Sequence, residues 1–424
     1  MFDEMGGSAV HTWQKWKFNH PVFHKACWSV LFVFIFILGK SIPLPYTDAK
    51  SLVVKNASLH VASLATGGDL TQLSLFSLGL SPWMSAMIIA NLLTQGRGFG
   101  MDRLSERRKD WISKEITLLL TVIQGFVLVS SMQLTQTGWA AKGAVLLTMT
   151  TGTMFIMWLS NMNALLGIGG LTLLVLANIL QSAMKTGLAG ILMLADHSTT
   201  RLMVVVAALV IIMVLFAYLN VMADRGEYRL PLVRLMIDNN YASRSYLPIK
   251  LTPAGGMPIM FAMSMITLPT YFCLFLLTFY PQNYWLAWGA TSFGFTKLPG
   301  IILYISLLFI LSLAFALVNV NAEQQAKAFQ RSGDYLLGVR PGKATERRIN
   351  LIALLFGVVG GVYNVIFAGM PMLMIVSHPG QLGIYMLPGY VLMIVGFSMG
   401  MIDQINILSI RKQYRPLFDH AKEV

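Results

Sequence analysis

The side chains that could do chemistry inside the apolar stretches of this 424-residue sequence are hydroxyl and amide groups. These groups donate and accept hydrogen bonds but carry no charge at neutral pH. In an apolar surrounding, a hydroxyl or amide is stabilised by a partner on a neighbouring helix. We therefore expect helix-to-helix hydrogen bonding from eight residues: Ser85, Asn91, Thr121, Gln124, Asn178, Gln181, Ser264 and Asn319.

The acidic side chains are placed elsewhere. All 18 Asp and Glu residues fall in a loop, in a tail or near the end of an apolar stretch, and no stretch has a histidine in its middle. Proton relays, acid–base catalysis and metal binding all need ionisable groups at the site itself. The sequence thus argues against an enzyme, an ion-coupled pump and a metal site, and it predicts no cofactor.

The polar side chains lie on ten apolar stretches that must position them. Each stretch is about as long as the 20 residues that cross a bilayer. The composition agrees, because 56% of the residues are hydrophobic and 12% are charged, which a soluble domain could not accommodate. We predict an all-α polytopic membrane protein with ten transmembrane helices. The predicted spans are 22–42, 76–95, 112–133, 143–162, 168–190, 201–222, 254–279, 298–320, 349–373 and 384–407.

The gaps between the apolar stretches are alternately rich and poor in Lys and Arg. Of the 31 Lys and Arg residues, 24 lie in the two tails and in the gaps 96–114, 223–250 and 322–348. This bias predicts that both termini and these gaps are cytoplasmic. It also explains the net charge of +13, because basic residues beside a membrane face anionic lipid. We therefore do not expect nucleic acid as a partner.

Two cytoplasmic gaps, 223–253 and 322–348, are longer than the topology needs. Loops of this length are usually functional. Both mix Arg with apolar residues, Pro and Gly, a composition that favours a folded hairpin or a short helix over a loose tether. We expect a protein partner to dock there.

The apolar run that ends near Leu93 does not begin like a simple span. Paired glycines, a polar stretch and then Ser81-Pro82-Trp83 indicate a short helix, a break and a second helix. Irregular backbone at membrane depth is tolerated only where protein buries it or water fills a cavity. This segment therefore indicates a pore.

Four stretches of the sequence resemble the SecY family, the channel subunit of the Sec protein translocase, in order and spacing. They are ATGGDLTQLSLFSLGLSPWMSAMIIANLL from Ala65, TGTMFIMWLSNMNALLGIGG from Thr151, GGMPIMFAMSMITLP from Gly255 and LLGVRPGKATERRI from Leu336. The resemblance extends over nearly the whole chain, and VRPGKAT is its most specific part.

The resemblance implies two inverted five-helix halves, 1–195 and 196–424, which open sideways between the second and seventh spans. It also implies an apolar ring that closes around a translocating chain, and a plug near 62–74 that blocks the outer funnel. The ring positions are Leu80, Met84, Leu176, Leu180, Met260 and Met393. The plug positions are Gly67, Gly68, Leu70 and Leu73.

The resemblance further implies a lateral gate and a motor-docking surface. The gate positions are Ser85, Asn91, Thr121, Gln124 and Ser264. The docking positions are Arg225, Arg229, Arg340, Pro341, Gly342 and Lys343. A SecA-type ATPase would dock on this surface, and the further partners of this chain would be small SecE- and SecG-like subunits, the unfolded polypeptide that is exported, and membrane lipid. The sequence has no Walker phosphate loop, so the energy would come from that motor.

Two departures from the usual SecY pattern favour the divergent SecY paralogue that belongs to the accessory Sec system of Gram-positive bacteria. Where SecY has a polar Glu-Gln-Ile-Thr stretch before Gly-Ile-Gly-Asn-Gly, this chain has Asn161 to Ala164 and then Gly167 to Leu171, and the hairpin between spans six and seven is shortened. This paralogue exports glycosylated serine-rich adhesins across the cytoplasmic membrane. The alternatives are a housekeeping SecY, a small-solute transporter and a polytopic membrane enzyme.

Overall fold

The fold, given by a computed structural model, is a bundle of long helices. It describes residues 21–47, 73–95, 105–132, 134, 138–194, 199–233, 246–295, 297–377 and 382–410. In these residues each of the ten predicted spans coincides with one helix or one run of helical turns. They are α2 (Pro21–Ser41), α4 (Ser81–Gln95), α5 (Glu106–Ser131), α6 (Trp139–Leu166), α7 (Leu171–Leu194), α8 (Thr199–Arg225), α9 (Met257–Phe279), α11 (Leu298–Val320), the run that begins with α13 (Lys343–Asn364), and α15 (Leu382–Ile410).

The ninth span is a composite. After α13 come a π-helical turn (Val365–Gly369), α14 (Met370–Leu373) and a 3₁₀ turn (Met374–Val376). Among the described residues, seven helical stretches are long and apolar enough to cross a membrane, and α4 and α7 contribute shorter apolar helices. The predicted fold class, a multi-pass helical membrane protein, is confirmed.

The two long gaps are folded, as predicted. The first forms the hairpin of β1 (Glu227–Val233) and β2 (Tyr246–Lys250), and the second forms α12 (Ala322–Ser332) and β3 (Tyr335–Leu336). The sequence did not predict that they share one antiparallel sheet of order β2-β1-β3, in which Val233 pairs with Tyr335. The predicted docking residues of both gaps therefore lie on or next to one small sheet.

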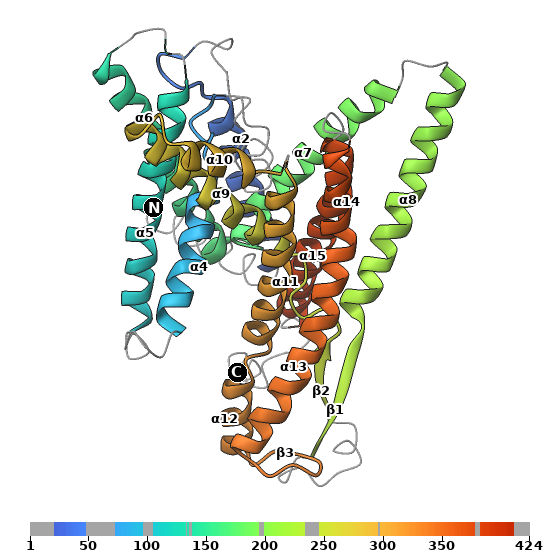
Figure 1. Cartoon of the computed structure of the whole chain (residues 1–424). Coiled ribbons are helices and arrows are strands. Elements are labelled where there is room, and N and C mark those ends of the chain that lie inside the picture. The colour runs from blue at the N-terminus through green and yellow to red at the C-terminus, as the bar shows by residue number, and fades with distance from the viewer. Residues whose placement is uncertain are drawn as a thin grey trace, which may run out of the picture.

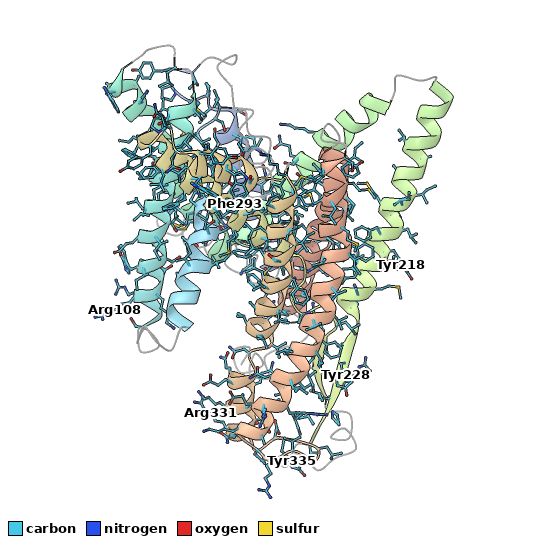
Figure 2. All side chains as sticks on the ribbon, in the orientation of Figure 1. Arg108, Tyr218, Tyr228, Phe293, Arg331 and Tyr335 are labelled. Carbon is cyan, nitrogen blue, oxygen red and sulfur yellow. The ribbon has the colours of Figure 1, made fainter. Side chains whose placement is uncertain are left out.

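This sheet and α12 extend from one end of the bundle, whereas the short helix α10 (Tyr284–Ser292) packs against α9 toward the opposite end (Figure 1). Tyr228, Arg331 and Tyr335 mark the sheet end in Figure 2. A buried cluster that includes Leu230, Leu232 and Leu336 fixes the sheet on α11 and α13. The sheet is thus a rigid extension of these spans.

The segment before α4 is bent rather than helical. Its backbone is pinned to the end of α2, because Leu44 N donates to Leu73 O at 2.8 Å and Leu75 N donates to Ile42 O at 3.0 Å. The helix begins at Ser81, five residues after the predicted start at 76. The predicted break is confirmed, and the short helix predicted before it lies outside the described residues.

Close contact between this bent segment and α6 depends on Gly152, since a Cβ there would overlap the Leu75 carbonyl oxygen. Gly143 on the same helix faces open space. We expect Gly152→Ala to lower the free energy of unfolding by ~1–3 kcal/mol through overpacking. Gly143→Ala should leave it unchanged or raise it, because alanine favours the helix. Thermal unfolding of both variants in detergent tests this, and equal stabilities would contradict it.

Candidate functional site

Four of the six predicted ring residues lie together at the centre of the bundle. Leu80, Met84, Met260 and Met393 are at most 1% exposed and belong to one hydrophobic cluster. Leu176 is partly buried and packs against this cluster. Five of the six positions thus belong to this cluster or pack against it, and we call these five residues the apolar waist.

The sixth position is different. Leu180 on α7 is 50% exposed and is not a member of the cluster. The face of α7 that is buried instead carries Val175, Asn178 and Ile179. Leu180 therefore does not contribute to the packed waist in this conformation.

Four elements bring the waist residues together, and Leu176 is the residue that α7 contributes. Leu80 precedes α4 and Met84 lies in its first turn, while Met260 lies in the first turn of α9. The start of α9 approaches α15 closely, because a Cβ at Gly256 would lie 3.1 Å from the Cα of Met393. The waist is thus made from helix starts on one side and the middle of α15 on the other.

A seam of serine hydroxyls joins α4 to α9 directly beside the waist. The Ser85 and Ser264 Oγ atoms are 2.8 Å apart, and Ser264 Oγ donates to the Ser81 carbonyl oxygen at 2.8 Å. Ser81 Oγ is a further 3.3 Å from Ser264 Oγ. The predicted hydrogen bond between helices is confirmed for Ser85 and Ser264. Ser81, which the sequence indicated only as part of a break, completes the seam.

Of the other predicted gate positions, the two whose side chains the structure describes make no such bond between helices. Thr121 is buried, but its Oγ1 donates to the Thr117 carbonyl oxygen of its own helix at 2.7 Å. Gln124 is buried with neither amide atom hydrogen-bonded to a described residue. Asn91 lies in α4, and its side chain is outside what the structure describes. The polar contact across α4 and α9 therefore rests on serines.

The plug falls largely outside the described residues, which include none of Gly67, Gly68 and Leu70. Leu73, at its end, is buried and belongs to a second hydrophobic cluster with Leu44, Leu128 and Tyr271. This cluster adjoins α5, α6 and α9.

The predicted docking residues of the first gap are exposed, one at the end of α8 and one on the hairpin. Arg225 ends α8, and the Arg229 guanidinium pairs with the Glu227 carboxylate at 2.8 Å while covering the Tyr246 ring at 4.7 Å. These contacts hold Arg229 in one orientation on the solvent face of the strand. Such a planar, always charged group suits binding to carboxylates or backbone carbonyls.

The docking residues of the second gap follow β3. Arg340, Pro341 and Lys343 are exposed, and Gly342 has φ +102°, a backbone conformation that L side chains rarely adopt. The Thr345 hydroxyl donates to the Arg340 carbonyl oxygen at 3.0 Å and so fixes this turn. Lys343 begins α13, where the positive end of the helix dipole disfavours a cation.

Lys250 ties the hairpin to the bundle. Its Nζ lies 3.4 Å from the Asp224 carboxylate of α8 and 3.2 Å from the Asp403 carboxylate of α15. Burial lowers the pKa of Lys250, but the two carboxylates outweigh this effect and the pKa is raised. A raised pKa means that the pair stabilises the fold throughout the neutral range and is lost only as the pH rises through that pKa.

Two buried polar arrangements were not predicted in detail. Lys40 donates to Asn178 at 2.6 Å and Gln181 at 2.9 Å, so these amides do bond between helices, as expected, but to a lysine near the end of α2. The signal in the sequence was Lys40 itself, because an ionisable side chain within an apolar span is usually functional.

The second arrangement is in the unusual stretch between α6 and α7. Asn163 is fully buried, and its Nδ2 donates to the Ile168 and Gly170 carbonyl oxygens at 3.1 and 2.9 Å. Ser29 Oγ accepts from Ile168 N at 2.7 Å. Gly169 N also donates to the Gln404 side chain of α15 at 2.9 Å. The altered sequence thus forms a fixed turn that contacts α2 and α15.

Comparison with known proteins identifies relatives along nearly the whole chain. A profile of the SecY family matches residues 74–402. The chain is 33% identical to the accessory Sec system protein translocase subunit SecY2 of Streptococcus gordonii, over 95% of this chain and 99% of that protein. It is 36% identical to the SecY2 of Streptococcus pneumoniae, over 93% and 97% of the two chains.

Solved structures share the fold at lower sequence identity. A structure described as that of a protein conducting channel has a TM-score of 0.71 at 17% identity and covers 94% of this chain and 95% of its own. Sec61 in the canine ribosome-channel complex has a TM-score of 0.64 at 15% identity, with the same coverage.

The serine seam predicts that α4 and α9 can be cross-linked. With the native cysteines Cys27 and Cys273 replaced by serine, a Ser85→Cys, Ser264→Cys protein should form a disulfide under mild oxidation, because the two Oγ atoms are 2.8 Å apart. The control pair joins Ser85→Cys to Ser306→Cys, since Ser306 is exposed on α11 and bonds its own helix. Non-reducing gels with proteolysis give the readout. Equal cross-linking in both pairs would contradict the seam.

Proposed function

The chain belongs to the SecY family, and from this premise we propose that it is the protein-conducting channel of an accessory Sec system. It passes unfolded polypeptide across the cytoplasmic membrane, driven by a SecA-type ATPase. The proposal rests on the SecY2 relatives that match over more than nine tenths of this chain. Both the relatives and the structural neighbours are named for protein translocation rather than for catalysis, so we assign no catalytic residue.

The apolar waist is the observation that best supports a channel for polypeptides. Leu80, Met84 and Met260 close the centre of the bundle with side chains that offer an ion no polar partner. Methionine is unbranched and has three rotatable bonds, so its side chain can adapt to a changing passenger. A small-solute transporter would instead need polar groups at the midplane that fit its substrate.

The serine seam is the proposed exit into lipid. Hydrogen bonds between membrane helices contribute only ~0.6–2 kcal/mol each. An apolar signal segment that packs between α4 and α9 could replace the contacts of Ser85 and Ser264 at little net cost. Signal segments would leave through this seam, and polar chain would continue through the waist.

The proposed movement divides the chain into halves 1–195 and 196–424. The halves meet along α4, α5 and α9 on one side and along α7 and α15 on the other. The contact of α4 and α5 with α9 contains the serine seam. The contact of α7 with α15 is supplemented by the hydrogen bond that Gly169 N donates to the Gln404 side chain. We infer that the first side opens and the second acts as the hinge, while the plug at 62–74 clears the outer funnel.

The sheet domain is the proposed dock for the motor, with both termini on the same cytoplasmic side. Arg225, Arg229 and Arg340 are exposed there. An acidic surface on the motor would also relieve the unfavourable position of Lys343 at the start of α13. Small SecE- and SecG-like subunits would complete the complex in the membrane.

Two features favour the accessory channel over a housekeeping SecY. Relatives at 30–36% identity are accessory Sec system SecY2 proteins. The turn built by Asn163 also replaces the polar stretch that SecY usually has before its Gly-rich motif. Glycosylated serine-rich adhesins are the proposed passengers.

Transport by the purified protein tests the function. Vesicles that contain the chain, its small subunits and the accessory SecA-type motor should import a serine-rich preprotein on addition of ATP and protect it from protease. A motor-free sample and a housekeeping preprotein are the controls. Protection of both preproteins would support the housekeeping alternative, and protection of neither would contradict the proposal.

Charge reversal at the dock gives a sharper test. We expect Arg340→Glu to weaken motor binding by about tenfold or more, a loss of ~1.4 kcal/mol, because like charges would then face each other. Arg108→Glu is the control, since Arg108 is also exposed but lies at the end of α5, away from the sheet (Figure 2). Motor binding to the membrane-embedded protein is measured by titration. Equal losses in the two variants would mean a general effect of charge and exclude this dock.

A further inference from the structure

The bent segment that leads into α4 is anchored by one aromatic side chain. Phe76 is 1% exposed, and its ring stacks with that of Phe36 on α2 and with that of Phe155 on α6. The ring centroids are 5.8 and 6.1 Å apart, and the ring planes differ by only 11° and 14°. Aromatic rings at such separations attract one another beyond the effect of burying their area. Two helices of the bundle therefore hold this side chain.

The space for this ring depends on Gly39, which lies about one turn after Phe36 on α2. A Cβ at Gly39 would overlap the Phe76 ring. The ring has little freedom to turn aside, because it is stacked with Phe36 and Phe155. Helix α2 thus provides a slot for Phe76, with a glycine where the ring approaches the backbone and an aromatic side chain against its face.

The turn that joins Phe76 to Leu80 of the waist is tightly folded. Ser77 Oγ accepts from Ser74 N at 2.8 Å and donates to the Ser74 carbonyl oxygen at 2.6 Å. Gly79 has φ +59°, and its N–H donates to the Phe76 carbonyl oxygen at 3.0 Å. Leu80 follows this turn directly, so its position is tied to that of Phe76.

The same end of α2 also holds α7, which contributes Leu176 to the waist. Lys40 Nζ donates to Asn178 Oδ1 at 2.6 Å, two positions after Leu176. Lys40 follows Gly39 in the sequence, and its Nζ lies 5.8 Å from the centre of the Phe36 ring. The end of α2 therefore contacts two separate segments that carry waist residues.

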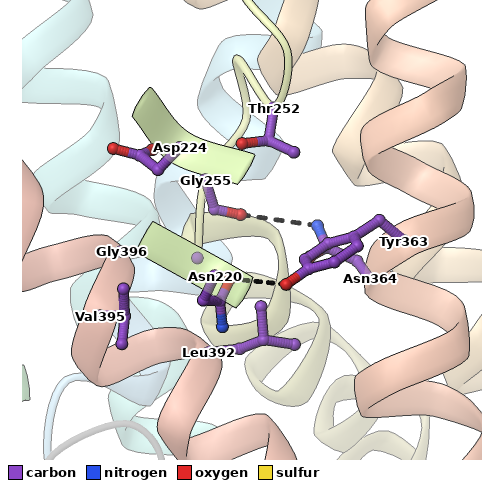
Figure 3. A pocket seen from close by; sticks show the side chains of 10 residues that line it. Asn220, Asp224, Thr252, Gly255, Tyr363, Asn364, Leu392, Val395 and Gly396 are labelled. Atoms are coloured by element: carbon purple, nitrogen blue, oxygen red, sulfur yellow. Dashed lines mark hydrogen bonds between the residues drawn. The ribbon is translucent and has the colours of Figure 1, made fainter. Parts of the chain in front are cut away.

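The start of α9 is held in a different way and by other helices. In the linker 251–256 before α9, the Pro253 carbonyl oxygen accepts from Asn319 Nδ2 of α11 at 2.8 Å. The Gly255 carbonyl oxygen accepts from Asn364 Nδ2 of α13 at 3.5 Å, as a dashed line in Figure 3 marks. Helices α4 and α9, which meet at the serine seam, are thus supported by separate sets of helices, one in each proposed half.

We propose that Phe76 is a positioning residue of the channel, which fixes Leu80 to α2 and α6 while the waist opens. The waist opens as Met260 and Met393 move away from Leu80, and Leu80 keeps its place relative to α2. The opening rests on the proposed function, whereas the placement of Leu80 by Phe76 does not depend on it.

A disulfide lock tests whether this segment stays in place during transport. Pro43 and Ser74 form an antiparallel bridge. The Cα atoms of such a pair lie about 4.5–5.5 Å apart, within the range of a disulfide. With the native cysteines replaced by serine, Pro43→Cys, Ser74→Cys should transport a preprotein equally well when oxidised and when reduced.

The matched control is the disulfide of Ser85→Cys, Ser264→Cys, which should block transport until it is reduced, because it joins α4 to α9. Loss of transport on oxidation of the Pro43→Cys, Ser74→Cys protein would overturn the proposal. Absence of transport in both reduced proteins would instead contradict the proposed function.

Labelling of Leu80→Cys by a water-soluble maleimide tests the placement without transport, since Leu80 is fully buried. Phe76→Leu removes the stacked ring and should speed labelling severalfold. Gly39→Ala alone should also speed it, because the added methyl group overlaps the ring. The double variant should return to the slow rate, since the methyl group then fills the space that the ring has left.

Phe216→Leu is the matched control. Phe216 is buried and contacts the Phe367 ring at 4.7 Å, but it lies on α8 in the other proposed half. Its substitution should leave the labelling of Leu80→Cys unchanged. Unchanged labelling in Phe76→Leu, equal acceleration by Phe216→Leu, or a double variant faster than either single one would overturn the proposal. Labelling needs neither motor nor preprotein, so it decides the role of Phe76 even if the proposed function fails.

Discussion

The packed apolar waist is the constraint on which the rest of the structure depends. Membrane helices gain no hydrophobic free energy from leaving lipid for one another, so their contact relies on close packing and a few polar bonds. At the waist this packing joins α4, α9 and α15 through Leu80, Met84, Met260 and Met393. Because these four side chains are apolar, no buried hydrogen-bonding group loses a partner when they move apart. An apolar contact of this kind can open and close again, which is why we propose it as the seal of the channel.

The polar contacts of the bundle are arranged around that seal. On one side, Ser85 and Ser264 close α4 against α9 with weak hydrogen bonds. At the end that carries the sheet, the linker before α9 is held by Asn364, and Lys250 joins it to the sheet that we propose as the dock. Force applied to the sheet therefore has a short, connected route to the helix that carries Met260 and Ser264.

The sequence predicts the helices well and the contacts between distant segments poorly. Ten apolar runs identify the spans, and the Gly, Ser and Pro residues before α4 identify the break, because both signals are local. The pairing of Val233 with Tyr335 joins residues about a hundred positions apart, and no local pattern indicates it. The same reason hides the bond of Lys40 to Asn178. Resemblance to SecY supplied the waist residues, but Leu180 shows that a matched position need not be packed in the observed conformation.

Cross-linking of a transport intermediate tests the central claim most directly. Single cysteines are placed at Met84 and Met260 in the waist, and at Leu351, which is 51% exposed on α13. A preprotein arrested in transit and carrying a cysteine along its length is then oxidised against each. The account predicts adducts from Met84→Cys and Met260→Cys and none from Leu351→Cys. Adducts from Leu351→Cys with none from the two waist positions would contradict it.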